Sequence, residues 1–177
     1  MRLIILAMLA TLLSGCAGPD IQQYKTVTPV LDPAEYFTGV IDAWGMFQKR
    51  NGEVTKRFHV EITGSQQQGV LTLDERFRYD DGTTQQRVWR LVRDGEGRWR
   101  GTAADVKGEA EGTAAGNALR WQYTLLLPVD GTTYEMQFDD WMFLIDRCTM
   151  INRASMRKFG IEFGQVTLTF RRRACNP

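Results

Sequence analysis

Apolar and polar side chains alternate along most of the chain. Phe58, Val60 and Ile62 are separated by the polar residues His59 and Glu61, and the same period of two returns further on. The later alternating runs lie at residues 70–79, 85–92, 119–127, 134–138 and 166–170. Because a strand directs successive side chains to opposite faces, each run predicts a β-strand with one buried face.

Short segments rich in aspartate and glycine separate these runs. They are YDDGTT at residues 79–84, RDGEGR at 93–98 and PVDGTT at 128–133. An Asp-Gly pair between two alternating runs is typical of an antiparallel hairpin. We therefore expect an all-β domain of about nine or ten antiparallel strands.

The number of strands favours a closed sheet. An open sheet leaves two unpaired edges, and closure into a single antiparallel up-and-down β-barrel removes them. A two-sheet β-sandwich is the alternative. Residues 101–118, which are small and rich in glycine, predict two slender strands at about 105–112 and 117–127.

The N-terminal region has a different pattern. Arg2 precedes an apolar run at residues 3–13, which is shorter than the ~20 residues of a transmembrane helix. A short apolar run after a basic residue is typical of a secretory signal. The sequence LSGC at residues 13–16 follows, and it resembles the lipobox of bacterial lipoproteins.

The lipobox resemblance implies a location for the protein. Residues 1–15 would be a signal peptide, cleaved between Gly15 and Cys16, and Cys16 would carry the lipid. Ala17 rather than aspartate follows the cysteine, which implies sorting to the outer membrane, facing the periplasm. The acyl chains would anchor the protein without a transmembrane helix, since each buried methylene contributes ~0.8 kcal/mol.

Three segments are expected after this assignment. They are the signal peptide at residues 1–15, the lipidated N-terminus and tether at 16–31, and the β-barrel domain at 32–177. Asp32, followed by proline at the next position, is typical of a helix start. A short helical turn should therefore precede the first strand.

Charge and cysteine content narrow the range of functions. Without Arg2, 21 basic side chains balance 21 acidic ones, so there is no electrostatic basis for binding nucleic acid. Cys148 and Cys175 remain once Cys16 is lipidated, an even pair in an oxidising compartment. They predict a disulfide that would stabilise the domain by ~3 kcal/mol, with two unpaired thiols as the alternative.

Five segments together resemble a known family. The bacterial lipoprotein family described as domain of unknown function 3833 is similar at residues 36–48, 73–82, 116–131, 138–144 and 151–170. This resemblance implies a lipocalin-type (calycin-like) barrel and carries no assigned activity. Members are often encoded beside enzymes that modify fatty acyl chains, which implies a task related to lipids.

Large apolar side chains are the candidates for a ligand cavity. Those we expect to line it are Trp44, Trp89, Trp121, Tyr123, Met136, Trp141 and Phe143. The same residues could equally form an aromatic-packed core. A polar mouth is expected from Asp139, Asp140, Arg153 and Lys158, where an acid–arginine pair would orient a ligand headgroup.

The sequence offers little for catalysis. His59 is the single histidine, and by its position in the alternation it faces away from Phe58, Val60 and Ile62. It is therefore poorly placed for a triad with Ser65 or Ser155. Asp139 and Asp140 are adjacent and should point to opposite faces of a strand, which argues against a paired-carboxylate site. We expect no catalytic residue, no metal site and no cofactor.

Three hypotheses of function follow. The first is a lipid-anchored periplasmic barrel that binds or carries an apolar ligand, such as an acyl chain or lipid, as an accessory to fatty-acyl modification. The second is a structural or docking lipoprotein with a filled core. The third is an enzyme acting on lipid through carboxylates or tyrosines. An interior cavity would favour the first hypothesis and a filled interior the second. A strongly perturbed titratable group in a cleft would favour the third.

Overall fold

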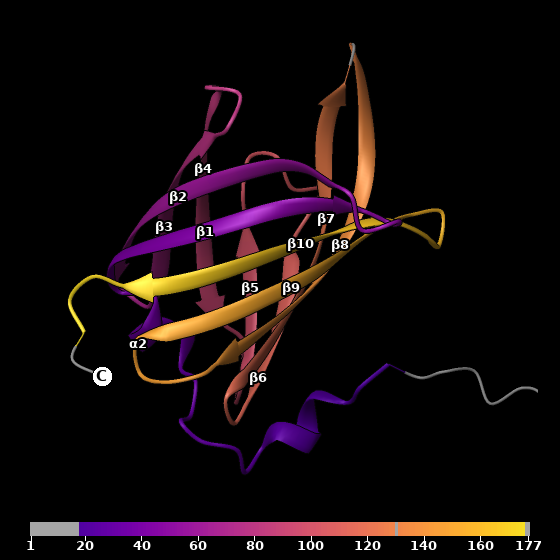
Figure 1. The fold of residues 1–177 in the computed structure, drawn as a ribbon. Coiled ribbons are helices and arrows are strands. Elements are labelled where there is room, and N and C mark those ends of the chain that lie inside the picture. The colour runs from indigo at the N-terminus through magenta and orange to yellow at the C-terminus, as the bar shows by residue number, and fades with distance from the viewer. Residues whose placement is uncertain (1–17, 130, 176–177) are drawn as a thin grey trace, which may run out of the picture.

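The chain forms a closed β-barrel (Figure 1). The computed structural model describes residues 18–129 and 131–175. The strands in this part are β1 (Gly39–Lys49), β2 (Val54–Gln67), β3 (Val70–Tyr79), β4 (Thr84–Arg93), β5 (Arg98–Thr102), β6 (Ala110–Ala115), β7 (Ala118–Val129), β8 (Thr132–Leu144), β9 (Thr149–Lys158) and β10 (Ile161–Arg172). The predicted signal peptide, its cleavage site and Cys16 lie outside the described residues.

Two short helices precede the barrel. They are the 3₁₀ helix η2 (Ile21–Tyr24) and the α-helix α2 (Pro33–Tyr36). Asp32 caps α2 by accepting a hydrogen bond from the Ala34 amide at 2.9 Å, as expected from the sequence. Among the described residues, no helix is sufficiently long and apolar to cross a membrane.

The barrel has up-and-down topology. Each strand pairs antiparallel with its neighbours in the chain, and β1 closes the sheet by pairing with β10, with Ala43 opposite Phe170. The predicted barrel is confirmed, and the sandwich alternative is wrong because the sheet closes on itself. The first slender strand was placed too early: residues 105–109 form a loop, and β6 begins at Ala110.

One end of the barrel is closed. α2 lies there, at the same end as the C-terminus (Figure 1), and its Tyr36 and Phe37 are buried. The Tyr36 hydroxyl donates to the carbonyls of Cys148 and Phe170. The Phe37 backbone lies directly against Gly64 of the barrel wall. A Cβ at position 64 would overlap the Phe37 carbonyl. Chain packing at this end thus blocks the interior from solvent.

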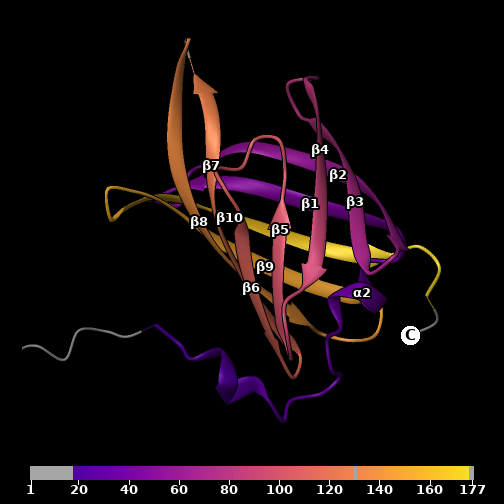
Figure 2. The same cartoon turned by 180° about the vertical axis from the view of Figure 1, so that it is seen from behind.

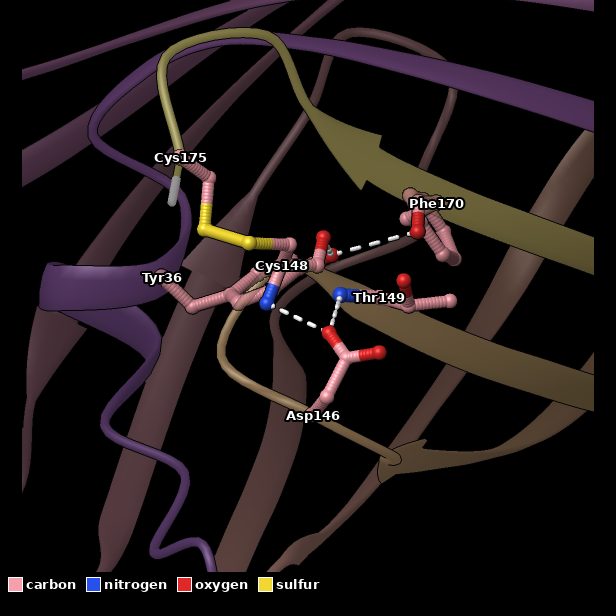
Figure 3. Close-up of a disulfide and its surroundings, with 6 residues drawn as sticks. All are labelled: Tyr36, Asp146, Cys148, Thr149, Phe170 and Cys175. Atoms are coloured by element: carbon pink, nitrogen blue, oxygen red, sulfur yellow. Dashed lines mark hydrogen bonds between the residues drawn. A yellow bond between two sulfur atoms is a disulfide. The ribbon is translucent and has the colours of Figure 1, made fainter. Parts of the chain in front are cut away.

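A disulfide ties the closed end together (Figure 3). It joins Cys148 to Cys175, whose Cα atoms are 5.6 Å apart, and so links the β8–β9 turn to the C-terminal tail. Asp146 accepts hydrogen bonds from the amides of Cys148 and Thr149, each at 2.7 Å, which fixes the turn. Seen from behind (Figure 2), the β3–β4 and β7–β8 turns lie at the end away from α2. We call that end the mouth.

Candidate functional site

The barrel interior contains a cavity of about 180 Å³. Its walls are the inward-facing positions of the alternating strands, and they are mainly aliphatic and aromatic. Phe37 lies at its closed end, and Phe47 and Leu127 belong to its wall near the mouth. A cavity with such a lining suits an apolar ligand or part of one.

Aromatic side chains shape one side of the cavity. Trp121 packs edge-on against Trp89, with ring centroids 5.7 Å apart. Its indole lies against Gly101 of β5 and Gly112 of β6, where a Cβ would overlap the ring. The two glycines therefore make room for the Trp121 indole against β5 and β6.

A group of polar side chains faces the interior at mid-depth. Glu75 on β3 stands directly opposite Arg87 on β4, and Tyr123 and Asp140 come from β7 and β8. All four line the cavity, and we call them the polar cluster. Along β3 the inward neighbours of Glu75 are leucine and phenylalanine, so the cluster has apolar surface on both sides along the barrel.

Arg87 is held by a carboxylate from the β5–β6 loop. Its Nε and Nη2 donate to Asp105 at 2.9–3.1 Å. Its Nη1 lies 3.9 Å from Glu75 Oε2, which is too far for a hydrogen bond. The Asp105 contact uses one edge of the guanidinium and leaves Nη1 facing the cluster.

The carboxyl groups of the cluster are strongly perturbed. Burial raises the pKa of Asp140 from 3.8 to about 8; the charge of Asp139 raises it as well, while Arg87 lowers it. Burial likewise raises the pKa of Glu75 from 4.5 to about 7, against the opposing charge of Arg87. Asp140 Oδ1 is buried without a hydrogen-bond partner among the described residues. The cluster thus contains a neutral acid with an unused hydrogen-bonding atom.

The cavity adjoins a hollow at the mouth. This mouth hollow has a volume of about 590 Å³. The hollow and the cavity share four lining residues: Phe47, Tyr79, Gln85 and Met156. Since α2 covers the other end, the mouth is the route by which a molecule would reach the interior.

Four of the expected cavity residues face the barrel interior. Trp89, Trp121 and Tyr123 line the cavity, and Met136 packs against the core beside it. The other three were assigned to the wrong face. Trp44 is 51% exposed on the outer surface, because β1 turns Ile41 and Ala43 inward and the intervening positions outward.

Trp141 and Phe143 also lie on the outside of the barrel. On β8 the inward positions are Asp140 and Met142, so the residues between them face out. Both rings pack against Tyr24 of η2, with centroids 6.1 and 5.2 Å away. Part of the segment predicted as a tether therefore covers this wall, which explains apolar side chains on both faces of β8.

The polar mouth expected from the sequence is not assembled. Asp139 faces outward and pairs with Arg120 at 2.8 Å, and Arg153 faces outward and bonds Gln165. Lys158, at the mouth end of β9, lies over the Tyr134 ring. Only Asp140 points inside, and it does so at mid-depth rather than at the mouth. As expected, the two adjacent aspartates point to opposite faces.

Two further functional candidates, Glu75 and Arg87, were missed. Their signal is present in the sequence: Glu75 shares its face with Leu73 and Phe77, and Arg87 shares its face with Trp89. A charged residue at an otherwise apolar position of an alternating strand is the pattern that would have found them.

The single histidine belongs to an outer surface network. His59 Nε2 lies 2.8 Å from Asp42, and Arg173 binds the same carboxylate. Neither Ser65 nor Ser155 takes part in that network. Within the described residues, no group of three histidine, cysteine, aspartate or glutamate side chains is arranged to hold a metal ion.

Solved structures resemble the barrel at low sequence identity. The S-type phycobiliprotein lyase CPES from Guillardia theta has a TM-score of 0.63 and 9% identity, over 89% of this chain and 100% of that one. Rv2717c from M. tuberculosis has a TM-score of 0.59 and 15% identity, over 81% of this chain and 99% of that one. At these identities the likeness extends to the fold alone. The search of curated proteins gave no match.

The sequence also matches a family model. This model, described as protein of unknown function (DUF3833), covers residues 10–172. The match includes every strand of the barrel and confirms the resemblance seen in the sequence motifs. The chain belongs to the DUF3833 family.

Proposed function

We propose that this barrel binds one elongated, mainly apolar molecule, such as an acyl chain or a lipid. In this proposal a lipid on Cys16 anchors the protein to the periplasmic face of the outer membrane, where it serves enzymes that modify fatty acyl chains. The observation that supports binding is the apolar interior cavity next to the mouth hollow. A filled barrel would lack the interior cavity.

The volume of the cavity limits what fits without movement. An apolar cavity of roughly 150 Å³ can hold one benzene-sized molecule, and this one is about 180 Å³. Ligand sites usually measure about 300–1,000 Å³. A chain of lipid length would therefore place one segment in the cavity and continue through the mouth hollow.

The polar cluster gives the ligand an orientation. A buried polar atom without a partner destabilises a protein by about 1–3 kcal/mol, and Asp140 Oδ1 is such an atom. A polar group on the ligand that forms a hydrogen bond with this oxygen would remove that destabilisation. We therefore propose an amphiphile whose polar group lies at the cluster and whose chain points toward the mouth.

The first test is a search for bound lipid. Residues 17–177 are expressed in the periplasm without Cys16, purified gently and examined by native mass spectrometry, followed by organic extraction. We expect a stoichiometric acyl species, or uptake of added fatty acid with a change in the fluorescence of Trp89 and Trp121. A clean protein mass with no uptake of fatty acid or phospholipid would refute the proposal and favour the docking lipoprotein.

A pair of variants makes the test specific for the interior. Ala154 is buried and lines the cavity, so Ala154→Phe should fill the cavity and abolish uptake. Ile151 lies on the same strand but is 40% exposed, so Ile151→Phe should leave uptake unchanged. Circular dichroism establishes that both variants are folded. Equal uptake by both would place the ligand outside the barrel.

A further inference from the structure

The turn between β9 and β10 has an unusual residue. It consists of Phe159 and Gly160, and both have positive φ, 52° and 76°. Two positive φ angles define a type I′ turn, which favours asparagine, aspartate or glycine and disfavours a bulky side chain. Phe159 is also 89% exposed. Packing within the described chain therefore does not compensate for its unfavourable backbone.

Two other apolar side chains lie next to this turn. Ile161 and Phe163 of β10 are 56% and 52% exposed. Phe163 also lines the mouth hollow. We call Phe159, Ile161 and Phe163 the apolar rim, because they form one edge of the mouth. An exposed apolar group of this kind marks a contact surface.

Basic side chains flank the apolar rim. Lys158 lies over the Tyr134 ring at 3.9 Å, and the Arg50 amide donates to the carbonyl of Phe163. The side chains of Lys158 and Arg50 form no ion pair with a carboxylate among the described residues, whereas neighbouring Lys49 pairs with Glu53. Two cations without a carboxylate partner, one of them over the Tyr134 and Phe159 rings, beside exposed aromatic and aliphatic side chains are typical of a surface that contacts anionic lipid.

We propose that the apolar rim inserts into the interface of an anionic lipid bilayer and holds the mouth of the barrel against the membrane. The charge at the rim favours lipid headgroups over a neutral protein surface. Fifteen residues, 17–31, span about 50 Å when extended, while a strand of 12 residues is about 40 Å long. A fully extended segment of this length would therefore exceed the length of the barrel wall.

Membrane contact can be measured without the lipid anchor. Residues 17–177 lacking Cys16 are sedimented with vesicles of phosphatidylethanolamine and phosphatidylglycerol, and with vesicles of phosphatidylcholine alone. The wild type should bind the anionic vesicles more tightly. Phe159→Asn should weaken this binding by about tenfold or more, and Lys158→Gln should weaken it on anionic vesicles only.

The choice of asparagine separates binding from folding. Asparagine suits a type I′ turn, so Phe159→Asn should unfold at the same temperature as the wild type or a higher one. Trp44→Gln is the matched control, because Trp44 is 51% exposed on the side of the barrel and away from the mouth. It should retain full vesicle binding.

The outcomes also separate this inference from the proposed function. Wild-type protein that ignores vesicles, or Phe159→Asn that binds them as well as the wild type, would overturn the membrane contact. A dimer or a protein partner lost in Phe159→Asn, without vesicle binding, would overturn it in favour of protein docking. Uptake of fatty acid from detergent should be the same in Phe159→Asn and the wild type. This measurement therefore detects a failure of ligand binding independently of membrane contact.

Discussion

Asp140 should make the protein less stable as the pH rises. In the unfolded chain this carboxyl ionises above its ordinary pKa of 3.8, but in the folded protein it stays protonated until about pH 8. Ionisation therefore favours unfolding between these two values and has no effect below the lower one. The difference corresponds to a loss of about 6 kcal/mol at pH 8, as an upper bound. That loss is comparable to the whole stability of many domains, about 5–15 kcal/mol.

The variant Asp140→Asn tests this reasoning. Asparagine has nearly the same shape and stays neutral, so the variant should be more stable than the wild type by several kcal/mol at pH 8 and similar to it at pH 4. The assay is urea unfolding, followed by circular dichroism at intervals from pH 4 to pH 8. Ionisation of Glu75 should also reduce the free energy of unfolding, by a smaller amount, between pH 4.5 and its folded pKa of about 7. The double variant with Glu75→Gln should therefore have the flattest profile.

The neighbouring aspartate provides the control. Asp139 is on the outer face and forms a half-buried ion pair with Arg120 through two hydrogen bonds of 2.8 Å, which should contribute more than the roughly 0–1 kcal/mol of a fully exposed pair. Asp139→Asn should lower stability. Because it removes the charge that adds to the raised Asp140 pKa, it should also reduce the loss at rising pH without abolishing it, since burial is the larger cause. If Asp140→Asn has the same pH profile as the wild type, Asp140 is not buried as a neutral acid, and the polar cluster is wrongly described.

Three other predictions concern the anchor, the disulfide and the wall. Cys16→Ser should abolish incorporation of radiolabelled palmitate; unchanged labelling would refute lipidation at this residue. Replacing Cys148 and Cys175 by serine should reduce the free energy of unfolding by about 3 kcal/mol, and dithiothreitol should have the same effect on the wild type but none on the variant. Gly112→Val should displace the Trp121 indole and destabilise the barrel by about 1–3 kcal/mol, with a change in tryptophan fluorescence; an unaltered spectrum would contradict the packing described.

The strands and their order were predictable because their causes are local. Alternation such as that of Phe58, Val60 and Ile62 depends on the side-chain period of a strand, and the Asp-Gly turns depend on backbone sterics. The errors came from choosing residues by type instead of by position. Trp44 and Trp141 are large and aromatic, but each occupies an outward position on its strand.

What covers each face could not be seen in the sequence. Trp141 and Phe143 are apolar because Tyr24 of η2 packs on the outside of β8, and nothing in the alternation of β8 reveals that cover. The polar cluster has a similar origin. Glu75, Arg87 and Asp140 come together because closure of the barrel brings β3, β4 and β8 around one axis.

The sequence by itself determined the antiparallel strands, the short capped helix and the pairing candidates Cys148 and Cys175, and it contains an LSGC motif that resembles a lipobox. Each of these features depends on residues close together in the chain or on the number of cysteines. The tertiary structure decided which apolar faces point to the cavity, where the buried acids meet and which end of the barrel is open. Those features depend on the register of paired strands and on contacts between segments more than 50 residues apart, such as Tyr36 with Cys148 and Phe170.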